Sequence, residues 1–431
     1  MGEIANLRIL LGELDDMLVT CMRCGMCQAV CPVFQDSMLE SDVARGKLAL
    51  LDSLAKRMID NPGEVKNRLE KCLLCGSCEA GCPSGVKVTE IFIKARAVLT
   101  GFMGLSPVKK AIFRGGLANP RLFGAMLTVG SKFQGLVTSE ANNFFGTSCS
   151  KLMSPFIGDR HFFPLAKKSL MSEVGAKDTG RGTADVRVAF YPGCVADRML
   201  PNLGKASLKA LEHHGCGVYM PKGQACCGIP ALASGDEQTM LKLLEKNLKR
   251  FSQGNYDVLV TPCATCTSTI KKLWPKMAVK ISPEAERKAQ RIADRAMDIS
   301  QFLTTKFGVE LGAGAVVGEK KTVTWHDPCH LKKSIGVAAE PREILKNLPG
   351  YEFVEMNEAD YCCGNGGSFN VIHYDTSSRI GGRKRDNILA SGADVVATGC
   401  PACMMQMTDM LSQGKHDVAV KHVMELYADS L

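Results

Sequence analysis

Short apolar runs alternate with helical patterns throughout residues 186–431. Four of these runs end in a cysteine and predict strands: VRVAFYPGC at 186–194, DVLVTPC at 257–263, KTVTWHDPC at 321–329 and DVVATGC at 394–400. Residues 202–215 have helical periodicity, and Gly215 marks the end of that helix. A strand, a loop with a chemical group and then a helix are typical of α/β domains, where functional groups gather at the carboxyl ends of parallel strands.

The cysteines of these loops form a five-member pattern that occurs twice. The second copy follows the first at offsets of 135, 136, 136, 137 and 137 residues, and CCGIP and TPCATC match CCGNG and TGCPAC. We interpret this pattern as a duplicated metal-binding module. The first copy holds Cys194, Cys226, Cys227, Cys263 and Cys266, and the second holds Cys329, Cys362, Cys363, Cys400 and Cys403.

Each copy carries more sulfur than an ordinary metal site needs. Five thiolates exceed the requirement of one tetrahedral ion or of a regular cubane cluster. The adjacent Cys226 and Cys227 require a sharp turn, for which Gly228 supplies the conformational freedom. The segment ATCTSTIKKLW is predicted to open a helix directly after Cys263. We expect the helices that start at Cys266 and Cys403 to direct their positive N-termini at an anionic cluster. A zinc site or an empty scaffold in at least one copy is the alternative.

Eight further cysteines lie in residues 1–100, in two groups with the spacing CxxCxxCxxxCP. This is the bacterial run for two [4Fe–4S] cubanes, in which the fourth cysteine of each group binds the other cluster. A pair of zinc ribbons is the alternative, but zinc needs neither the third spacing nor the proline. We therefore predict one cluster on Cys21, Cys24, Cys27 and Cys82, and the other on Cys72, Cys75, Cys78 and Cys31.

The amino-acid composition indicates the cellular compartment. The 431 residues suffice for two to four domains, and a hydrophobic content of 45% is that of an ordinary globular protein. Twenty cysteines, mostly in metal-type groups, indicate thiolates in a reducing compartment rather than a disulfide scaffold. The sequence shows no signal peptide, and no apolar stretch approaches about 18 residues. A cytoplasmic protein without a transmembrane segment is therefore expected.

Residues 101–185 are predicted to form a basic, Phe-rich connector. The part from 101 to 170 holds nine Lys or Arg residues against Glu140 and Asp159, and it holds nine of the 17 phenylalanines. No nucleic-acid reading module accompanies this charge, so nucleic acid is not expected as a partner. Wrapping around the other domains is our first interpretation, docking to a partner subunit the second, and contact with an anionic membrane surface the third.

The arrangement of motifs resembles a known family. The five-cysteine module is similar to the CCG domain of heterodisulfide reductases, and two cubane motifs before two CCG domains resemble the iron–sulfur subunit of glycolate and lactate oxidases. CMRCGMCQAVCPVFQ with VARGKLALL, CLLCGSCEAGCPSGV and CPACMMQMTD carry this similarity. Glycolate-oxidase subunits often have one degraded CCG copy, whereas both copies here keep all five cysteines, as heterodisulfide reductases do.

The resemblance implies a mixed α+β and α/β fold with a helical two-cluster ferredoxin-like domain and two duplicated α/β CCG domains. We expect the ferredoxin-like domain at 1–100, the connector at 101–185, the first CCG domain at 186–318 and the second at 319–431. Two cubane [4Fe–4S] clusters and one or two non-cubane [4Fe–4S] clusters are the implied cofactors.

The implied function is that of an oxidoreductase subunit. It would pass electrons from an FAD-containing 2-hydroxyacid (glycolate or lactate) dehydrogenase subunit towards quinone or another carrier, with peripheral attachment to the inner face of the cell membrane as one option. No GxGxxG opens a helix after a strand, so hydroxyacid oxidation is expected on the partner. The alternative is a heterodisulfide-reductase-like catalytic subunit that cleaves a disulfide at the non-cubane clusters. No catalytic residue is assigned.

Polar residues flank one cysteine of the second copy. His326, Asp327 and His330 surround Cys329 in the segment WHDPCH. They could relay protons, because histidine titrates near neutrality, or they could hydrogen-bond to a cluster ligand, which we favour. Cys149 and Cys216 match no motif and are interpreted as buried or idle thiols.

Overall fold

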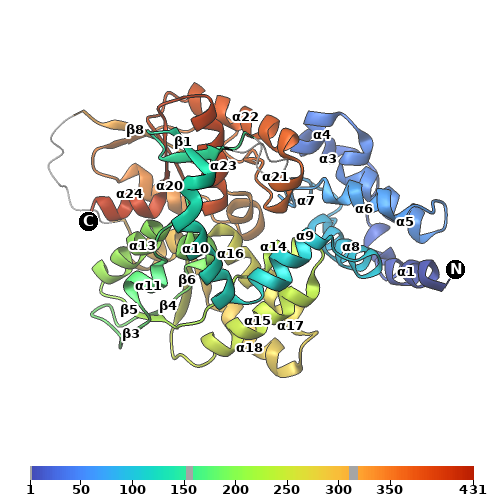
Figure 1. Ribbon diagram of the computed structural model, residues 1–431, viewed down its shortest axis with the longest axis horizontal. Helices are drawn as coiled ribbons and strands as arrows, with labels where there is room; N and C mark the ends of the chain where they lie inside the picture. The colour runs from blue at the N-terminus through green and yellow to red at the C-terminus, as the bar shows by residue number, and fades with distance from the viewer. Residues whose placement is uncertain (1, 152–158, 310–318) are drawn as a thin grey trace.

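The computed structural model describes residues 2–151, 159–309 and 319–431 (Figure 1). The N-terminal part is helical and lies at one end of the long axis of the molecule (Figure 1). Its cysteine-bearing loops precede the short helices α3 and α7, and longer helices pack behind them. The elements are α1 (Gly2–Gly12), α2 (Asp15–Leu18), α3 (Met26–Val30), α4 (Pro32–Ser37), η1 (Glu40–Asp42), α5 (Ala44–Ala55), α6 (Pro62–Glu70), α7 (Ser77–Ala80) and α8 (Val88–Met103).

Two sheets of mainly parallel strands follow, and their equivalent strands have the same order. β5-β4-β6-β7 of the first sheet corresponds to β9-β8-β10-β11 of the second. In the first sheet the order is β3-β5-β4-β6-β7, in which β3 alone is antiparallel, and in the second it is β11-β10-β8-β9. The duplicated sequence pattern therefore corresponds to a duplicated topology. The strands are β3 (Lys177–Asp178), β4 (Arg187–Phe190), β5 (Gly217–Met220), β6 (Val258–Thr261), β7 (Ala296–Asp298), β8 (Lys321–His326), β9 (Tyr351–Phe353), β10 (Val395–Thr398) and β11 (Ala419–His422).

Helices cover both sheets, and one apolar core joins them. Val188 and Phe190 of the first sheet belong to the same buried cluster as Val323 and Trp325 of the second. The helices of the first unit are α12 (Gly193–Arg198), α13 (Pro201–His213), α14 (Ile229–Ala233), α15 (Glu237–Phe251), α16 (Ala264–Ser268), η3 (Thr269–Leu273), α17 (Trp274–Ala278), α18 (Pro283–Asp294) and α19 (Ile299–Phe307). Those of the second are η4 (His330–Ser334), α20 (Ala339–Lys346), α21 (Ser368–Ile372), α22 (Tyr374–Ala390), α23 (Pro401–Gln413) and α24 (Val423–Asp429).

The predicted fold class is confirmed, and so are the predicted strands. The helix predicted at residues 202–215 is also confirmed, as α13. The helix after Cys263 begins at Ala264, as the segment ATCTSTIKKLW predicts, so both helices after the CxxC loops start before Cys266 and Cys403, at Ala264 and Pro401. Cys263 and Cys400 have extended backbones with φ of −141° and occupy the N-cap positions. The second cysteine of each pair therefore lies inside the first helical turn, where it still faces the positive helix end.

The connector runs from the helical domain across both sheet units. It contains α9 (Pro107–Lys110), η2 (Ala111–Leu117), α10 (Pro120–Val137), β1 (Thr138–Asn142), β2 (Thr147–Ser150) and α11 (Leu170–Val174). Phe113 packs into the core of the first unit, and the Thr147 hydroxyl lies 2.7 Å from the Ser412 hydroxyl on α23. No single helix among the described residues is long and apolar enough to cross a membrane, although α8 and the segment Pro107–Leu117, which is formed by α9 and η2 and lies at 109° to α8, pass that test together.

Helix α10 has its apolar face towards solvent. Leu122, Met126, Val129 and Phe133 follow one another at spacings of four and three residues, and each is more than half exposed. The opposite face, with the buried Gly124 and Ser131, packs on the protein. A surface helix ordinarily buries its apolar stripe against the protein. The exposed stripe of α10 is therefore a candidate binding surface.

Arg96 joins the helical domain to the first sheet unit. This side chain is 5% exposed, and its guanidinium donates to the carbonyls of Leu69 (2.5 Å), Cys72 (2.8 Å) and Ala233 (2.7 Å). The fit beside it is close, because a Cβ at Gly235 would lie 2.5 Å from the Arg96 carbonyl oxygen.

Replacing Arg96 with leucine would leave three buried carbonyls without their donor. At about 1 kcal/mol or more for each buried unsatisfied group, we expect Arg96→Leu to destabilise this junction by roughly 3 kcal/mol. Thermal unfolding of the anaerobic protein measures the effect as a lower melting temperature. Arg287→Leu, at an exposed position on α18, is the matched control. Equal melting temperatures for the two variants would contradict this role for Arg96.

Candidate metal centres

Two cavities in the helical domain collect its eight cysteines. Cys82 lines one cavity with Cys21, Cys24 and Cys27, and we name these four cysteines site A. The other cavity is lined by the four cysteines that we name site B: Cys31, Cys72, Cys75 and Cys78. Each cavity thus contains the fourth cysteine of the other group, which is the geometry that the exchanged-ligand prediction requires. The ligand assignment itself stays a prediction.

The two loops owe their shape to left-handed residues at equivalent positions. Gly25 and Gly76 have φ of 89° and 72°, and each precedes a short helix. Arg23 and Leu74 also have positive φ, although they carry side chains. This strained backbone brings amides to face the sulfur, since Leu74 N–H lies 3.4 Å from Cys72 Sγ.

Basic side chains adjoin both cavities. Arg45 lines the site A cavity and donates to the Arg23 carbonyl at 3.3 Å. Lys47 lines the site B cavity, is 2% exposed, and donates to the Lys71 carbonyl at 2.8 Å. Burial raises the pKa of the Cys31 thiol to about 12. A metal would therefore have to displace a proton there, and the buried Lys47 favours the resulting negative charge.

The cysteines of the first five-member pattern also come together, and we name them site C. Cys194 Sγ lies 3.7 Å from Cys226 Sγ, and Cys227 interacts with both Cys226 and Cys266. Hydrogen bonds from these neighbouring thiols hold the pKa of Cys227 well below its usual range. The members, Cys194, Cys226, Cys227, Cys263 and Cys266, follow β4, β5 and β6, so they gather at the carboxyl edge of the first sheet.

Polar and aromatic side chains support the CCG turn of site C from behind. The Tyr191 hydroxyl donates to the Ala225 carbonyl at 2.6 Å, and Trp274 Nε1–H donates to the Cys227 carbonyl at 2.9 Å. Asn247 accepts from Ala225 N–H at 2.9 Å. The turn is thus fixed through its backbone, which leaves the sulfurs free to bind a metal.

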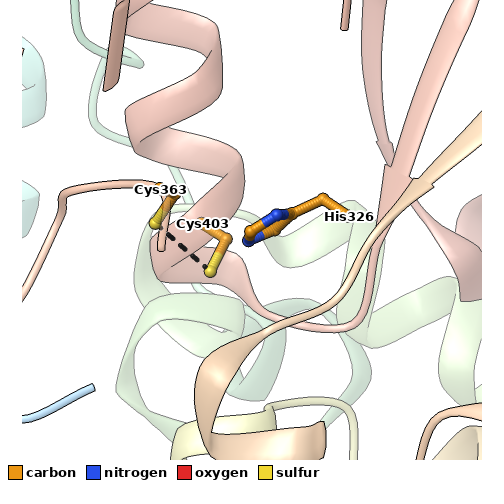
Figure 2. A group of neighbouring side chains, drawn as sticks. All are labelled: His326, Cys363 and Cys403. Carbon is orange, nitrogen blue, oxygen red and sulfur yellow. Dashed lines mark hydrogen bonds between the residues drawn. The ribbon is translucent and has the colours of Figure 1, made fainter. Parts of the chain in front are cut away.

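The second pattern forms the equivalent site D, with Cys329, Cys362, Cys363, Cys400 and Cys403. Cys363 Sγ lies 3.5 Å from Cys403 Sγ (Figure 2). Gly364 has φ of 94°, and its N–H lies 3.5 Å from Cys362 Sγ. A side chain at this glycine would meet the backbone of α22, because its Cβ would lie 2.7 Å from the Ser377 carbonyl oxygen. Glycine is therefore required after the cysteine pair for two reasons: its backbone conformation, as predicted, and the lack of space for a side chain.

The three polar residues of WHDPCH have different environments. Asp327 is paired with Arg342 at 2.8 Å and accepts from Trp325 Nε1–H, so it acts in a structural ion pair. His330 donates from Nε2 to the Leu74 carbonyl at 3.3 Å, and its Nδ1 lies 3.0 Å from the Thr265 hydroxyl. His326 is buried and points towards the thiols of site D (Figure 2).

Cysteines of neighbouring sites also contact one another. The Cys75 thiol of site B interacts with Cys362 of site D, and this interaction raises the pKa of Cys75. In the same way, Cys263 of site C interacts with Cys400 of site D, an interaction that lowers the pKa of Cys400. Cys78 lines the cavities of both site A and site B. The four sites therefore form a continuous series in the order A, B, D, C, which differs from their order in the sequence.

Sequence reasoning missed the residues that surround the sulfurs. Lys47 is a buried cation in a helix, and it lies in the quoted segment VARGKLALL, but the resemblance gave it no role beside a cluster. Tyr191 could have been found, because the offset of 135 residues pairs it with His326. Of the two cysteines outside the motifs, Cys216 is buried and belongs to the apolar core, and Cys149 lies 3.3 Å from the Ser139 hydroxyl.

The donor set fits iron–sulfur clusters. All eighteen motif cysteines belong to one of the four sites, and thiolate is the soft ligand that such clusters prefer. Cys24 is exposed, whereas four of the five cysteines in each of sites C and D are buried. Clusters bound at sites C and D would be protected from water by the protein.

Comparisons with known proteins agree with this assignment. The 4Fe-4S dicluster domain family matches residues 17–86, and the cysteine-rich CCG domain family matches residues 188–271 and 323–408. Iron–sulfur clusters are therefore the cofactors of this chain.

Two of the relatives match almost the whole chain, and a third matches about half of it. The chain is 30% identical over 403 residues to the "Probable glycolate oxidase iron-sulfur subunit" of Bacillus subtilis (strain 168), covering 90% of this chain and 88% of that protein. It is 30% identical over 417 residues to one subunit of the "Fumarate reductase (CoM/CoB)" of Methanothermobacter marburgensis, covering 92% and 80%. "Lactate utilization protein A" of Bacillus subtilis matches 56% of this chain at 30% identity, with 98% of that protein covered.

The exchange of ligands between sites A and B can be tested with pairs of substitutions. Cys21→Ala with Cys82→Ala should remove one cluster, or about four irons per molecule, because both cysteines belong to site A. Cys21→Ala with Cys31→Ala should remove about eight irons, because the two cysteines belong to different clusters. Iron and acid-labile sulfide analysis of anaerobic protein measures both losses, with Cys149→Ala as control. The reverse pattern of losses would show that each group keeps its own fourth cysteine.

Proposed function

This chain belongs to the family of iron–sulfur oxidoreductase subunits that includes glycolate oxidase iron-sulfur subunits, and we propose that it carries electrons for a hydroxyacid dehydrogenase. An FAD-containing partner would oxidise a 2-hydroxyacid of the glycolate or lactate type. This chain would accept the electrons one at a time and pass them towards quinone or another carrier. We further propose that its domains divide at residues 100, 185 and 318, the last of which lies outside the described residues.

One observation carries this proposal: the four cysteine sites touch in series. Iron–sulfur clusters supply one-electron transfer when bound. The chain's own residues set the distances between them. Ala264 N–H donates to the Gly399 carbonyl at 3.0 Å, which joins the loops of sites C and D. His330 joins site D to the loop of site B through Leu74. We propose cubane clusters at sites A and B and non-cubane clusters at sites C and D.

Site A is the end of the series that reaches the surface. Site A contains the exposed Cys24, around which Val19, Met22 and Met26 are each more than half exposed. At the other end, Cys194 of site C is half-buried. Exposed methionine and valine around a redox centre form an apolar surface suited to a protein partner. We propose that the flavoprotein docks at the site A end.

Cysteines occupy the carboxyl ends of the parallel strands in both sheets. In α/β proteins, substrates bind at the carboxyl ends of parallel strands. Here the loops after β4, β6, β8 and β10 carry the cysteines of sites C and D. The position that an α/β enzyme would use for substrate or nucleotide is thus taken up by metal ligands, which supports an electron-transfer role.

One arrangement favours a second candidate function. Sites C and D face each other through Cys263 and Cys400, and both keep all five cysteines. Two facing non-cubane clusters are what the resemblance to heterodisulfide reductases requires for disulfide cleavage. A heterodisulfide-reductase-like catalytic subunit is therefore the alternative.

Helix α10 supports a further proposal about location. Its outward apolar stripe follows the exposed Val108 and Ile112, and no acidic residue lies between positions 101 and 139. An apolar helix face in a basic segment is suited to anionic lipid surfaces. We propose that the α10 stripe attaches the protein peripherally to a membrane.

Electron delivery through site A can be measured directly. With the FAD-containing partner present, glycolate or lactate should bleach the visible absorption of the clusters, and without the partner it should not. Met22→Glu with Met26→Glu should weaken the partner's binding about tenfold, because charges replace an apolar contact. Met58→Glu, 72% exposed in the wild type, is the matched control. Reoxidation of the reduced chain by a disulfide, with no response to any hydroxyacid, would establish the alternative instead.

Membrane attachment can be tested by flotation with vesicles that contain anionic lipid. The wild type should float with the vesicles and dissociate as the salt concentration rises. Leu122→Ser, Val129→Ser and Phe133→Ser together should abolish flotation, since they remove most of the stripe. Val279→Ser with Val371→Ser, at positions that are also exposed, should leave it unchanged. Equal flotation of all three proteins, or none by the wild type, would refute the attachment.

A further inference from the structure

His326 is a buried polar side chain without a protein partner among the described residues. It ends β8, is 1% exposed, and neither Nδ1 nor Nε2 has a hydrogen-bond partner there. One ring nitrogen and the sulfurs of Cys363 and Cys403 all lie within 4.8 Å of one another (Figure 2). Burying an imidazole without a partner costs roughly 1–3 kcal/mol, so a group at site D is expected to bind it.

The neighbouring charged groups have other partners. Asp327, the adjacent carboxylate, is paired with Arg342 and with Trp325. Lys384, a buried cation that acts electrostatically on His326, donates to the carbonyls of Glu358 and Ala359. His326 thus has no protein acceptor in the part of the chain that the structure describes, and the sulfurs of site D are the polar groups that it faces (Figure 2).

The equivalent position in site C has a different chemistry. The offset of 135 residues pairs His326 with Tyr191, which is also buried beside cysteines. The Tyr191 hydroxyl is already used, because it donates to the Ala225 carbonyl at 2.6 Å. The duplicated sites therefore differ in one respect: site D has an N–H donor available, and site C has a donor that points to the backbone.

We propose that His326 donates a hydrogen bond to a sulfur of the cluster held at site D and thereby makes that cluster easier to reduce than its counterpart at site C. This inference rests on the proposed occupancy of site D by an iron–sulfur cluster. A neutral imidazole carries one N–H donor, and hydrogen bonds to cluster sulfur raise the reduction potential, because they stabilise the added negative charge. His326 is a positioning and tuning residue in this proposal and not a catalytic one.

The consequence concerns the two CCG sites as a pair. In the series A, B, D, C, site D lies between the cubane sites and site C. A higher potential at site D makes it the place where an electron arriving from site B rests. Site C then receives electrons only from an already reduced neighbour. Two sites that look alike in the sequence would thus have distinct roles.

The experiment is a redox titration of the whole protein followed by EPR, on wild type, His326→Phe, His326→Asn and Tyr191→Phe. In His326→Phe we expect one cluster to shift to a more negative potential, while the other clusters keep theirs. His326→Asn retains an N–H donor and should lie nearer the wild type. Tyr191→Phe is the comparison at the equivalent position: it removes the hydroxyl that supports the site C turn, so it should leave unchanged the potential of the cluster that His326→Phe shifts.

A second measurement needs no substitution at the site. Wild-type protein labelled with ¹⁵N-histidine should show nitrogen coupling on one cluster signal, and labelled His326→Asn should lack it. His326→Phe protein with wild-type iron content and unchanged potentials would overturn the proposal, as would labelled wild type without nitrogen coupling. Wild-type protein whose iron content accounts for fewer clusters than four, with site D unfilled, would instead overturn the proposed cofactor content. The two failures are therefore distinguishable.

Discussion

The contact between cysteine loops from different domains is the constraint on which the rest of the structure depends. Site B meets site D through Cys75 and Cys362, and site D meets site C through Cys263 and Cys400. These contacts hold only if the helical domain and both sheets keep fixed positions. Arg96, His330 and the shared apolar core provide that rigidity. Packing between domains, rather than within any one of them, is thus what keeps the four sites in the series that the proposed electron transfer requires.

The same constraint explains where the charges lie. Clusters with thiolate ligands are anionic, and burying them in apolar surroundings would be costly without compensation. Lys47 lies in the wall of site B, Lys333 donates to the Ser77 hydroxyl beside Cys75, and helix N-termini face sites C and D. Both lysines are themselves held by carbonyls or hydroxyls. The protein therefore supplies positive potential from fixed positions and needs little reorganisation when an electron arrives.

Much of the architecture could be predicted from the sequence, because cysteine spacing and strand patterns are local signals. The strands before Cys194, Cys263 and Cys400 and the gathering of cysteines at sheet edges follow from alternation and topology. The series A, B, D, C could not be predicted, since it depends on which surfaces of three domains meet. The helix start at Ala264 was predicted, whereas the start at Pro401 was not, because an extended N-cap cysteine looks the same in sequence as a helical one. The outward stripe of α10 was missed because periodicity gives a helix its apolar face but not the direction of that face.

Sites C and D are duplicates that differ at one position, and this difference can give electron transfer between them a preferred direction. Two identical clusters side by side would exchange electrons without preference, and a relay built from them would have no bias. Tyr191 and His326 occupy equivalent places beneath the two CCG turns, yet one uses its donor on the Ala225 carbonyl and the other keeps its donor for the site. The backbone of the first turn must then be fixed by Tyr191, Asn247 and Trp274, whereas the second turn relies on Gly364 packing against α22. The residue at this one position therefore decides whether the donor supports the turn, as Tyr191 does, or is free to raise the reduction potential of the site, as we propose for His326. This difference gives electron transfer between sites D and C a preferred direction.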